Sequence, residues 1–63
     1  MSELSDKMIL YRAKQRISQA ELARRCGVTL QTIYAIEKGI QNPSRVTEVK
    51  IRLVVDSRKK AEE

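Results

Sequence analysis

The sequence predicts a small all-α domain. Its 63 residues are enough for one domain only. Two short helical patterns follow one another within residues 18–39, and each begins with its own start signal. A glycine separates the two patterns, at Gly27. These observations predict two helices of roughly two turns each joined by a tight turn, which is a helix-turn-helix.

The first helix of this motif is expected to open at Gln19. Ser18 is a good N-cap, and Glu21 three residues later completes a capping box. Apolar residues then recur at helical spacing, and Gly27 can adopt the left-handed conformation that ends a helix. The residues of this apolar stripe are Ala20, Leu22, Ala23 and Cys26.

The second helix of the motif is expected between Thr29 and Gly39. Thr29 is its N-cap, and Gly39 after Lys38 is its stop signal. Ile33 and Ile36 form its apolar stripe, with Val28 beside them. Gly39 to Pro43 reads as a loop, because the residue before a proline is biased out of the helical region.

An earlier helix is expected from about Asp6 to Arg16, with Asp6 as its N-cap or first-turn acid. Residues 1–5 and the charged tail 57–63 are expected to be frayed. The whole chain, 1–63, is treated as a single domain. The apolar face of the earlier helix is expected to comprise Met8, Ile9, Leu10, Ala13 and Ile17.

Residues 44–56 fit two structures. As a helix capped by Ser44, Val46, Val49 and Leu53 share one face, while Ile51 and Val55 lie on nearly the opposite side. As a strand, residues 48–53 alternate strictly between polar and apolar and are rich in β-branched residues. The serine cap and the neighbouring short helices favour the helix. The alternative fold is three helices followed by a dimerising β-strand.

The composition favours a polyanionic partner and excludes several other functions. The net charge is +5 and the pI is about 9.8. A single cysteine rules out an intrachain disulfide, and without histidine it cannot build a zinc site, so we expect no metal, no cofactor and no enzymatic activity. No apolar run approaches the ~20 residues that span a bilayer, so a cytoplasmic protein is expected. Positive charge collects around the motif, at Arg12, Lys14, Arg16, Arg24 and Arg25.

Residues 18–43 resemble the lambda-repressor-like helix-turn-helix family of Cro and phage-repressor type. The resemblance is carried by Ser18-Gln19-Ala20-Glu21-Leu22-Ala23, Gly27-Val28-Thr29, Gln31-Thr32-Ile33, Ile36-Glu37-Lys38-Gly39 and Asn42-Pro43-Ser44. It implies a compact four-helix DNA-binding domain, usually dimeric, whose second motif helix lies in the major groove. It therefore implies double-stranded DNA as partner and no small-molecule ligand.

The resemblance also implies roles for individual residues. Gln31 is the strongest candidate base reader, since its amide can pair bidentately with adenine. Tyr34 is given a mixed role, toward base edges or the backbone. The other candidates for base contact are Leu30, Thr32 and Ala35; those for phosphate contact are Gln19, Thr29, Lys38, Gln41, Asn42 and Arg24.

Two further expectations concern structure rather than base reading. Arg12 and Glu37 occupy positions where some relatives form an ion pair between the first helix and the recognition helix. Arg45, Glu48 and Arg52 are charged where many relatives have apolar or small residues. Either the last helix is rotated so that Val46, Val49 and Leu53 face the core, or this segment is not a helix.

The function expected from these features is a sequence-specific transcriptional regulator of a prokaryote or phage, acting on its nucleoid. A dimeric repressor on an inverted repeat fits best, with Ile51 and Val55 as the surplus apolar surface at the dimer interface. The alternative is a small protein-interaction subunit, antitoxin-like or anti-repressor, that binds a partner through its C-terminal apolar element.

Overall fold

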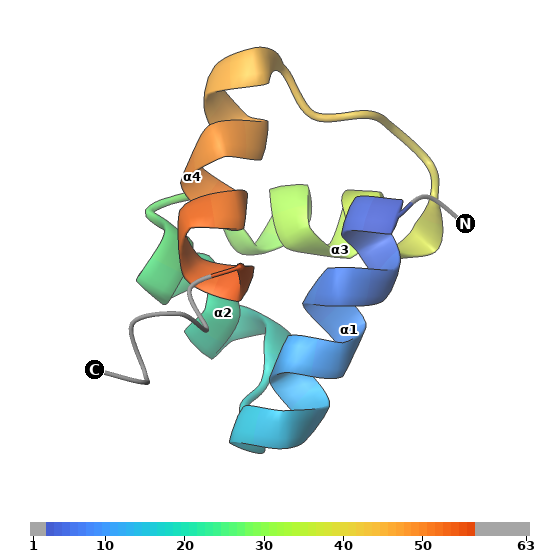
Figure 1. Cartoon of the computed structure of the whole chain (residues 1–63). Coiled ribbons are helices and arrows are strands. Elements are labelled where there is room, and N and C mark those ends of the chain that lie inside the picture. The colour runs from blue at the N-terminus through green and yellow to red at the C-terminus, as the bar shows by residue number, and fades with distance from the viewer. Residues whose placement is uncertain (1–2, 57–63) are drawn as a thin grey trace.

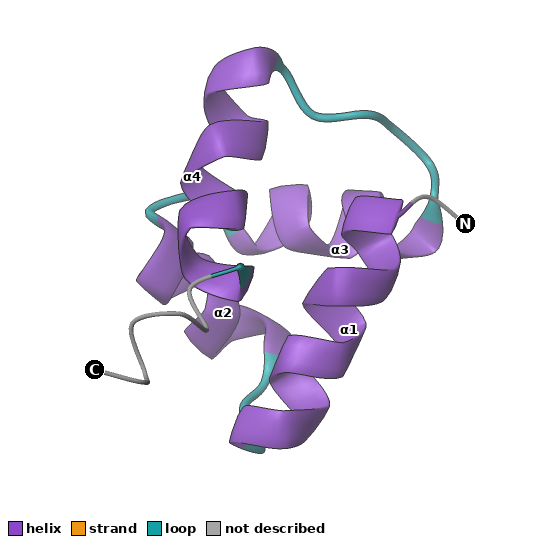
Figure 2. Ribbon diagram, in the orientation of Figure 1, coloured by secondary structure: helices purple, strands orange, loops and turns teal. Residues whose placement is uncertain are grey.

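The computed structural model describes residues 3–56, which form four α-helices (Figure 1). Within this range there is no strand (Figure 2), so the all-α prediction is confirmed and the alternative with a C-terminal strand is wrong. The charged tail 57–63 lies outside the described residues. The helices are α1 (Glu3–Gln15), α2 (Gln19–Cys26), α3 (Leu30–Lys38) and α4 (Arg45–Val55).

Helix α1 begins at Glu3, three residues before the expected start at Asp6. Leu4 and Ser5, which were expected to be frayed, are buried, and Met8 is buried with them. Leu4, Met8 and Tyr11 recur at spacings of four and three, so they form the inner face of the helix. The sequence prediction of the apolar face was therefore wrong for three residues that are exposed in the structure: Ile9, Leu10 and Ala13.

One core joins all four helices. Met8 from α1, Leu22 from α2, Ile33 from α3 and Ile51 from α4 are completely buried in it. Burial of such a side chain stabilises the fold by about 1.5–3 kcal/mol relative to leaving it exposed. The remaining buried apolar residues are Leu4, Ala23, Cys26 and Ile36.

Helix α4 is rotated opposite to the expectation. Ile51 has 0% exposure, so its predicted place at a dimer interface is wrong, and Val55, which was predicted with it, is half-buried against the core. The prediction that the opposite side of the helix would face the core is wrong as well. That side is exposed and consists of Val46, Val49 and Leu53.

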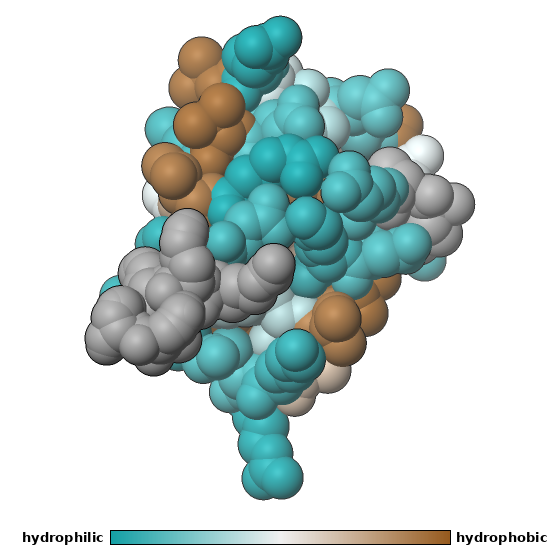
Figure 3. Space-filling view, viewed as in Figure 1, coloured by the Kyte–Doolittle hydropathy of each residue, from teal (hydrophilic) through white to brown (hydrophobic). Residues whose placement is uncertain are grey.

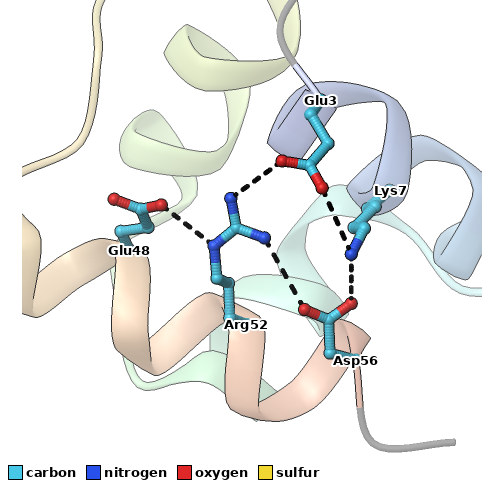
Figure 4. Close-up of polar contacts among 5 residues, drawn as sticks. All are labelled: Glu3, Lys7, Glu48, Arg52 and Asp56. Atoms are coloured by element: carbon cyan, nitrogen blue, oxygen red, sulfur yellow. Dashed lines mark hydrogen bonds and ion pairs between the residues drawn. The ribbon is translucent and has the colours of Figure 1, made fainter.

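In this rotation, five charged side chains form a network between α1 and α4 (Figure 4). Lys7 on α1 contacts Asp56 at 2.8 Å, and Arg52 on α4 reaches Glu3 at 3.3 Å. Arg52 also contacts Glu48 at 2.9 Å. The cations lower the pKa of both Glu3 and Asp56 below their usual values, chiefly through hydrogen bonds from Arg52 and Lys7 respectively. Arg52 and the capping residue Asp56 thus face the charged first half of α1, with Glu48 beside Arg52, whereas Arg45 and Lys50 are exposed.

Candidate nucleic-acid interface

The motif helices α2 and α3 are bounded by the predicted caps. Ser18 Oγ accepts from the backbone N–H of Glu21 at 3.1 Å, and Thr29 Oγ1 accepts from that of Thr32 at 3.2 Å. Gly27 (φ 73°) and Gly39 (φ 77°) take the left-handed conformation after each helix. A side chain at φ near +75° is strained for almost any residue except glycine, which explains why both stops are glycines.

Helix α3 buries one side and exposes the other. Ile33 and Ile36 enter the core, and Glu37 is buried beside them. On the opposite side, successive turns present Leu30, Gln31, Tyr34 and Lys38 to solvent. Because the helix is fixed from behind, these four side chains project from a rigid support.

The remaining predicted base contacts lie at the edges of this exposed row. Ala35 is half-buried. Thr32 is also half-buried, and its hydroxyl lies 2.9 Å from that of Thr29, so both threonines take part in the cap of α3. Lys38 places its ammonium 5.7 Å from the centre of the Tyr34 ring, within the range of a cation–π contact. This contact holds a positive charge over the exposed aromatic ring.

Behind the exposed row, three polar side chains from three helices meet. Arg12 on α1 donates twice to the Glu37 carboxylate, from Nε to Oε2 and from Nη2 to Oε1, both at 2.9 Å. This is the ion pair that the resemblance implied, and the hydrogen bonds to Glu37 raise the pKa of Arg12. Gln19 on α2 donates from Nε2 to the same Oε1 at 3.0 Å. No pattern in the sequence indicated the Gln19 contact, because it joins residues 18 positions apart.

Arg24 is exposed, but it already has an anionic partner. Its guanidinium contacts Glu21 at 2.6 Å, and Arg25 contacts the same carboxylate at 3.0 Å. The two hydrogen-bonded arginines, Arg24 foremost, lower the pKa of Glu21 to about 2. Glu21 is therefore ionised at neutral and mildly acidic pH, and it neutralises one of the two positive charges on this surface of α2.

The last two predicted phosphate contacts, Gln41 and Asn42, are exposed in the segment between α3 and α4. Cys26 is buried among apolar side chains, and burial raises the pKa of its thiol. Among residues 3–56 no three acidic or cysteine side chains gather as metal ligands would. None of the four helices is long and apolar enough to cross a membrane.

Comparison with known proteins agrees with this geometry. The sequence profile of a family described as helix-turn-helix matches residues 8–50. An uncharacterized HTH-type transcriptional regulator of Methanocaldococcus jannaschii is 44% identical over 48 residues, which cover 76% of this chain and 73% of that protein. Two uncharacterized HTH-type transcriptional regulators of Archaeoglobus fulgidus are also 44% identical over 48 residues, covering 68% and 69% of their lengths. No solved structure matches the chain significantly.

The profile spans more than half of α1, both motif helices and the first half of α4, so it covers the exposed row on α3 and the polar residues behind it. The chain belongs to the lambda-repressor-like helix-turn-helix family of DNA-binding transcriptional regulators.

Proposed function

We propose that this regulator is a dimeric repressor that reads an inverted repeat in double-stranded DNA by placing α3 in the major groove. The observation that carries the proposal is the exposed row on α3, held rigid by the buried face of the same helix. A bound dimer would occlude polymerase from the promoter. The regulator would act on the DNA of the nucleoid, in the cytoplasm of a prokaryotic cell. It would require no cofactor and no small-molecule ligand.

Within the exposed row, Gln31 would supply most of the sequence preference, because its amide offers a donor and an acceptor to adenine or to another base edge. Leu30 and Ala35 can pack only against a thymine methyl group. Tyr34 can contact a base edge or donate its hydroxyl to a phosphate. Thr32, at the edge of the row, would make the remaining base contact.

The phosphate contacts would surround this row and supply much of the affinity, which should fall steeply with salt. Lys38 contributes a full positive charge at the end of α3, whereas Arg24 contributes less because Glu21 already pairs with it. The other phosphate contacts are neutral side chains at the ends of the motif helices and in the loop that follows, namely Gln19, Thr29, Gln41 and Asn42.

The dimer partner would cover the exposed side of α4, which we call the α4 stripe: Val46, Val49 and Leu53. These residues are 64%, 47% and 72% exposed, and Figure 3 shows apolar side chains gathered along α4. Three aliphatic side chains are a smaller surface than the roughly 1,200–2,000 Å² of a stable interface. We therefore expect the two copies to associate chiefly on DNA, where adjacent half-sites bring the two stripes together.

Selection of bound sequences from a random duplex pool tests the proposal. We expect enrichment of an inverted repeat with half-sites about 10 base pairs apart, centre to centre. Sedimentation should give a monomer for the free chain at micromolar concentration and two copies per selected duplex. Enrichment of a single half-site with one bound copy would contradict the dimer, and the absence of any enriched sequence would favour the protein-interaction alternative.

Substitution of the base reader should change specificity. Gln31→Ala should weaken binding to the selected duplex by about 1–3 kcal/mol and relax the preference at one base position. Gln41→Ala is the matched control, since it removes an exposed amide outside α3 and should weaken binding to all duplexes alike. Competition titrations with duplexes changed at single positions measure both effects. An equal loss on selected and random DNA for Gln31→Ala would rule out its role as base reader.

A further inference from the structure

The side chain of Gln19 bridges the two motif helices at the end opposite their turn. Gln19 is the first residue of α2, and its Nε2 donates to Glu37 Oε1 at 3.0 Å in the last turn of α3. Glu37 is 7% exposed, and Arg12 fixes both of its carboxylate oxygens at 2.9 Å. The acceptor that Gln19 meets is therefore held in place from a third helix.

This arrangement determines which end of the Gln19 amide faces the protein. A carboxylate held by arginine can only accept hydrogen bonds, so it attracts the amide nitrogen and repels the amide oxygen. The amide nitrogen has two hydrogens, and Glu37 uses one of them. The structure gives the second no acceptor among residues 3–56. Phosphate oxygens also only accept hydrogen bonds. The same orientation therefore leaves Gln19 with a free N–H donor, which is the group that a phosphate requires.

We propose that Glu37 is a positioning residue for DNA binding: held by Arg12, it fixes the Gln19 amide so that the second Nε2–H donates to a DNA phosphate. The inference rests on the proposed function, because it needs Gln19 to meet the backbone. It assigns to a buried residue, which never touches DNA, a share of the affinity. It also links α1 to the DNA surface through two successive side-chain contacts, Arg12 to Glu37 and Glu37 to Gln19.

A double-mutant cycle on the selected duplex tests this coupling. Gln19→Ala should weaken binding about tenfold, as expected for loss of a hydrogen bond to a charged group. Glu37→Gln should weaken it by a similar factor, because the introduced amide can either accept from the Gln19 nitrogen or donate to the Gln19 oxygen, and so no longer fixes which end of Gln19 faces the DNA. In the Glu37→Gln background, Gln19→Ala should then cost less than about threefold. Gln41→Ala, a neutral amide that does not contact Glu37, is the control and should have the same effect in both backgrounds.

Ethylation interference gives a readout that a purely structural role of Glu37 would not change. Ethylation of the phosphate that Gln19 contacts, one in each half-site, should weaken binding of the unmodified chain. The same ethylation should have no effect on binding of the Gln19→Ala variant. The same phosphate should become insensitive for Glu37→Gln. If Glu37 only stabilised the fold, the variant would bind more weakly but keep the full sensitivity at that phosphate.

A second variant guards against loss of folding. Replacing both charged partners by similar apolar side chains, Arg12→Met with Glu37→Met, keeps the volume of the site and removes the acceptor. Thermal unfolding should show that this variant is folded. Its DNA binding should also become insensitive to ethylation of the phosphate that Gln19 contacts. Additive losses in the cycle, or retained sensitivity in either Glu37 variant, would overturn the inference.

The two proposals fail in different ways. If Gln19→Ala leaves affinity unchanged while the chain still selects an inverted repeat, the positioning role is wrong and the proposed function stands. If the unmodified chain selects no duplex at all, the proposed function and the inference fall together.

Discussion

Replacing Ile51 by alanine is expected to lower the free energy of unfolding by about 2–5 kcal/mol, because the side chain is completely buried and its removal leaves a cavity. A domain of this size has only about 3–5 kcal/mol of stability from its core. The Ile51→Ala chain should therefore be largely unfolded at 25 °C. Urea denaturation followed by circular dichroism measures the effect.

Leu53→Ala is the matched control for this prediction. Leu53 lies two residues further along α4 and is 72% exposed, so its truncation should change stability by less than about 0.5 kcal/mol. For a helix in this segment, the sequence analysis expected the reverse, with Leu53 on the side facing the core. If Leu53→Ala proved as destabilising as Ile51→Ala, the rotation of α4 described above would be wrong.

The helix-turn-helix could be predicted because its signals are local. A capping side chain lies three residues from the N–H that it satisfies, and each stop requires one glycine at a left-handed position. The boundaries of α2 and α3 therefore follow from a few neighbouring residues. The exposed row on α3 follows as well, since Ile33 and Ile36 fix which side faces the core.

The rotation of α4 could not be predicted in the same way, because the helix has aliphatic residues on two opposite sides. Each of the two opposite rotations of α4 buries some of these residues and exposes the others. The apolar area that is buried therefore differs little between the two rotations. The observed rotation also brings Arg52 to Glu3, and Asp56 just after the helix to Lys7. Those partners lie 49 residues away, in a segment that was expected to be frayed or to begin a helix.

The start of α1 was missed for a related reason. Leu4 and Ser5 precede Asp6, the residue taken as the cap or first-turn acid of this helix, yet both are buried. Tertiary packing against the core, and the contacts of Glu3 with Arg52 and Lys7, extend the helix beyond what its own residues indicate. The candidate site shows the same limit, since the Arg12–Glu37 pair came from the resemblance while the contact of Gln19 with Glu37 came from the structure alone.

Removing the charge of Arg12 alone should destabilise the domain strongly. Arg12→Met leaves the buried Glu37 carboxylate with Gln19 as its remaining side-chain donor among the described residues. Loss of one partner of a buried pair costs about 3–5 kcal/mol, and we expect about 2–4 kcal/mol here because the Arg12 side chain is 25% exposed. Thermal and urea unfolding at neutral pH should show the loss, which would consume most of the stability of so small a domain.

The double variant Arg12→Met with Glu37→Met should recover that loss. Both charges are then absent, so no desolvated carboxylate remains, and two flexible apolar side chains fill a similar volume. We expect stability within about 1 kcal/mol of the unmodified chain, or above it, as found when buried ion pairs are replaced by apolar groups. Such recovery together with weakened DNA binding would mean that the pair serves recognition more than folding. A double variant as unstable as Arg12→Met alone would instead assign the pair to holding α1 against α3.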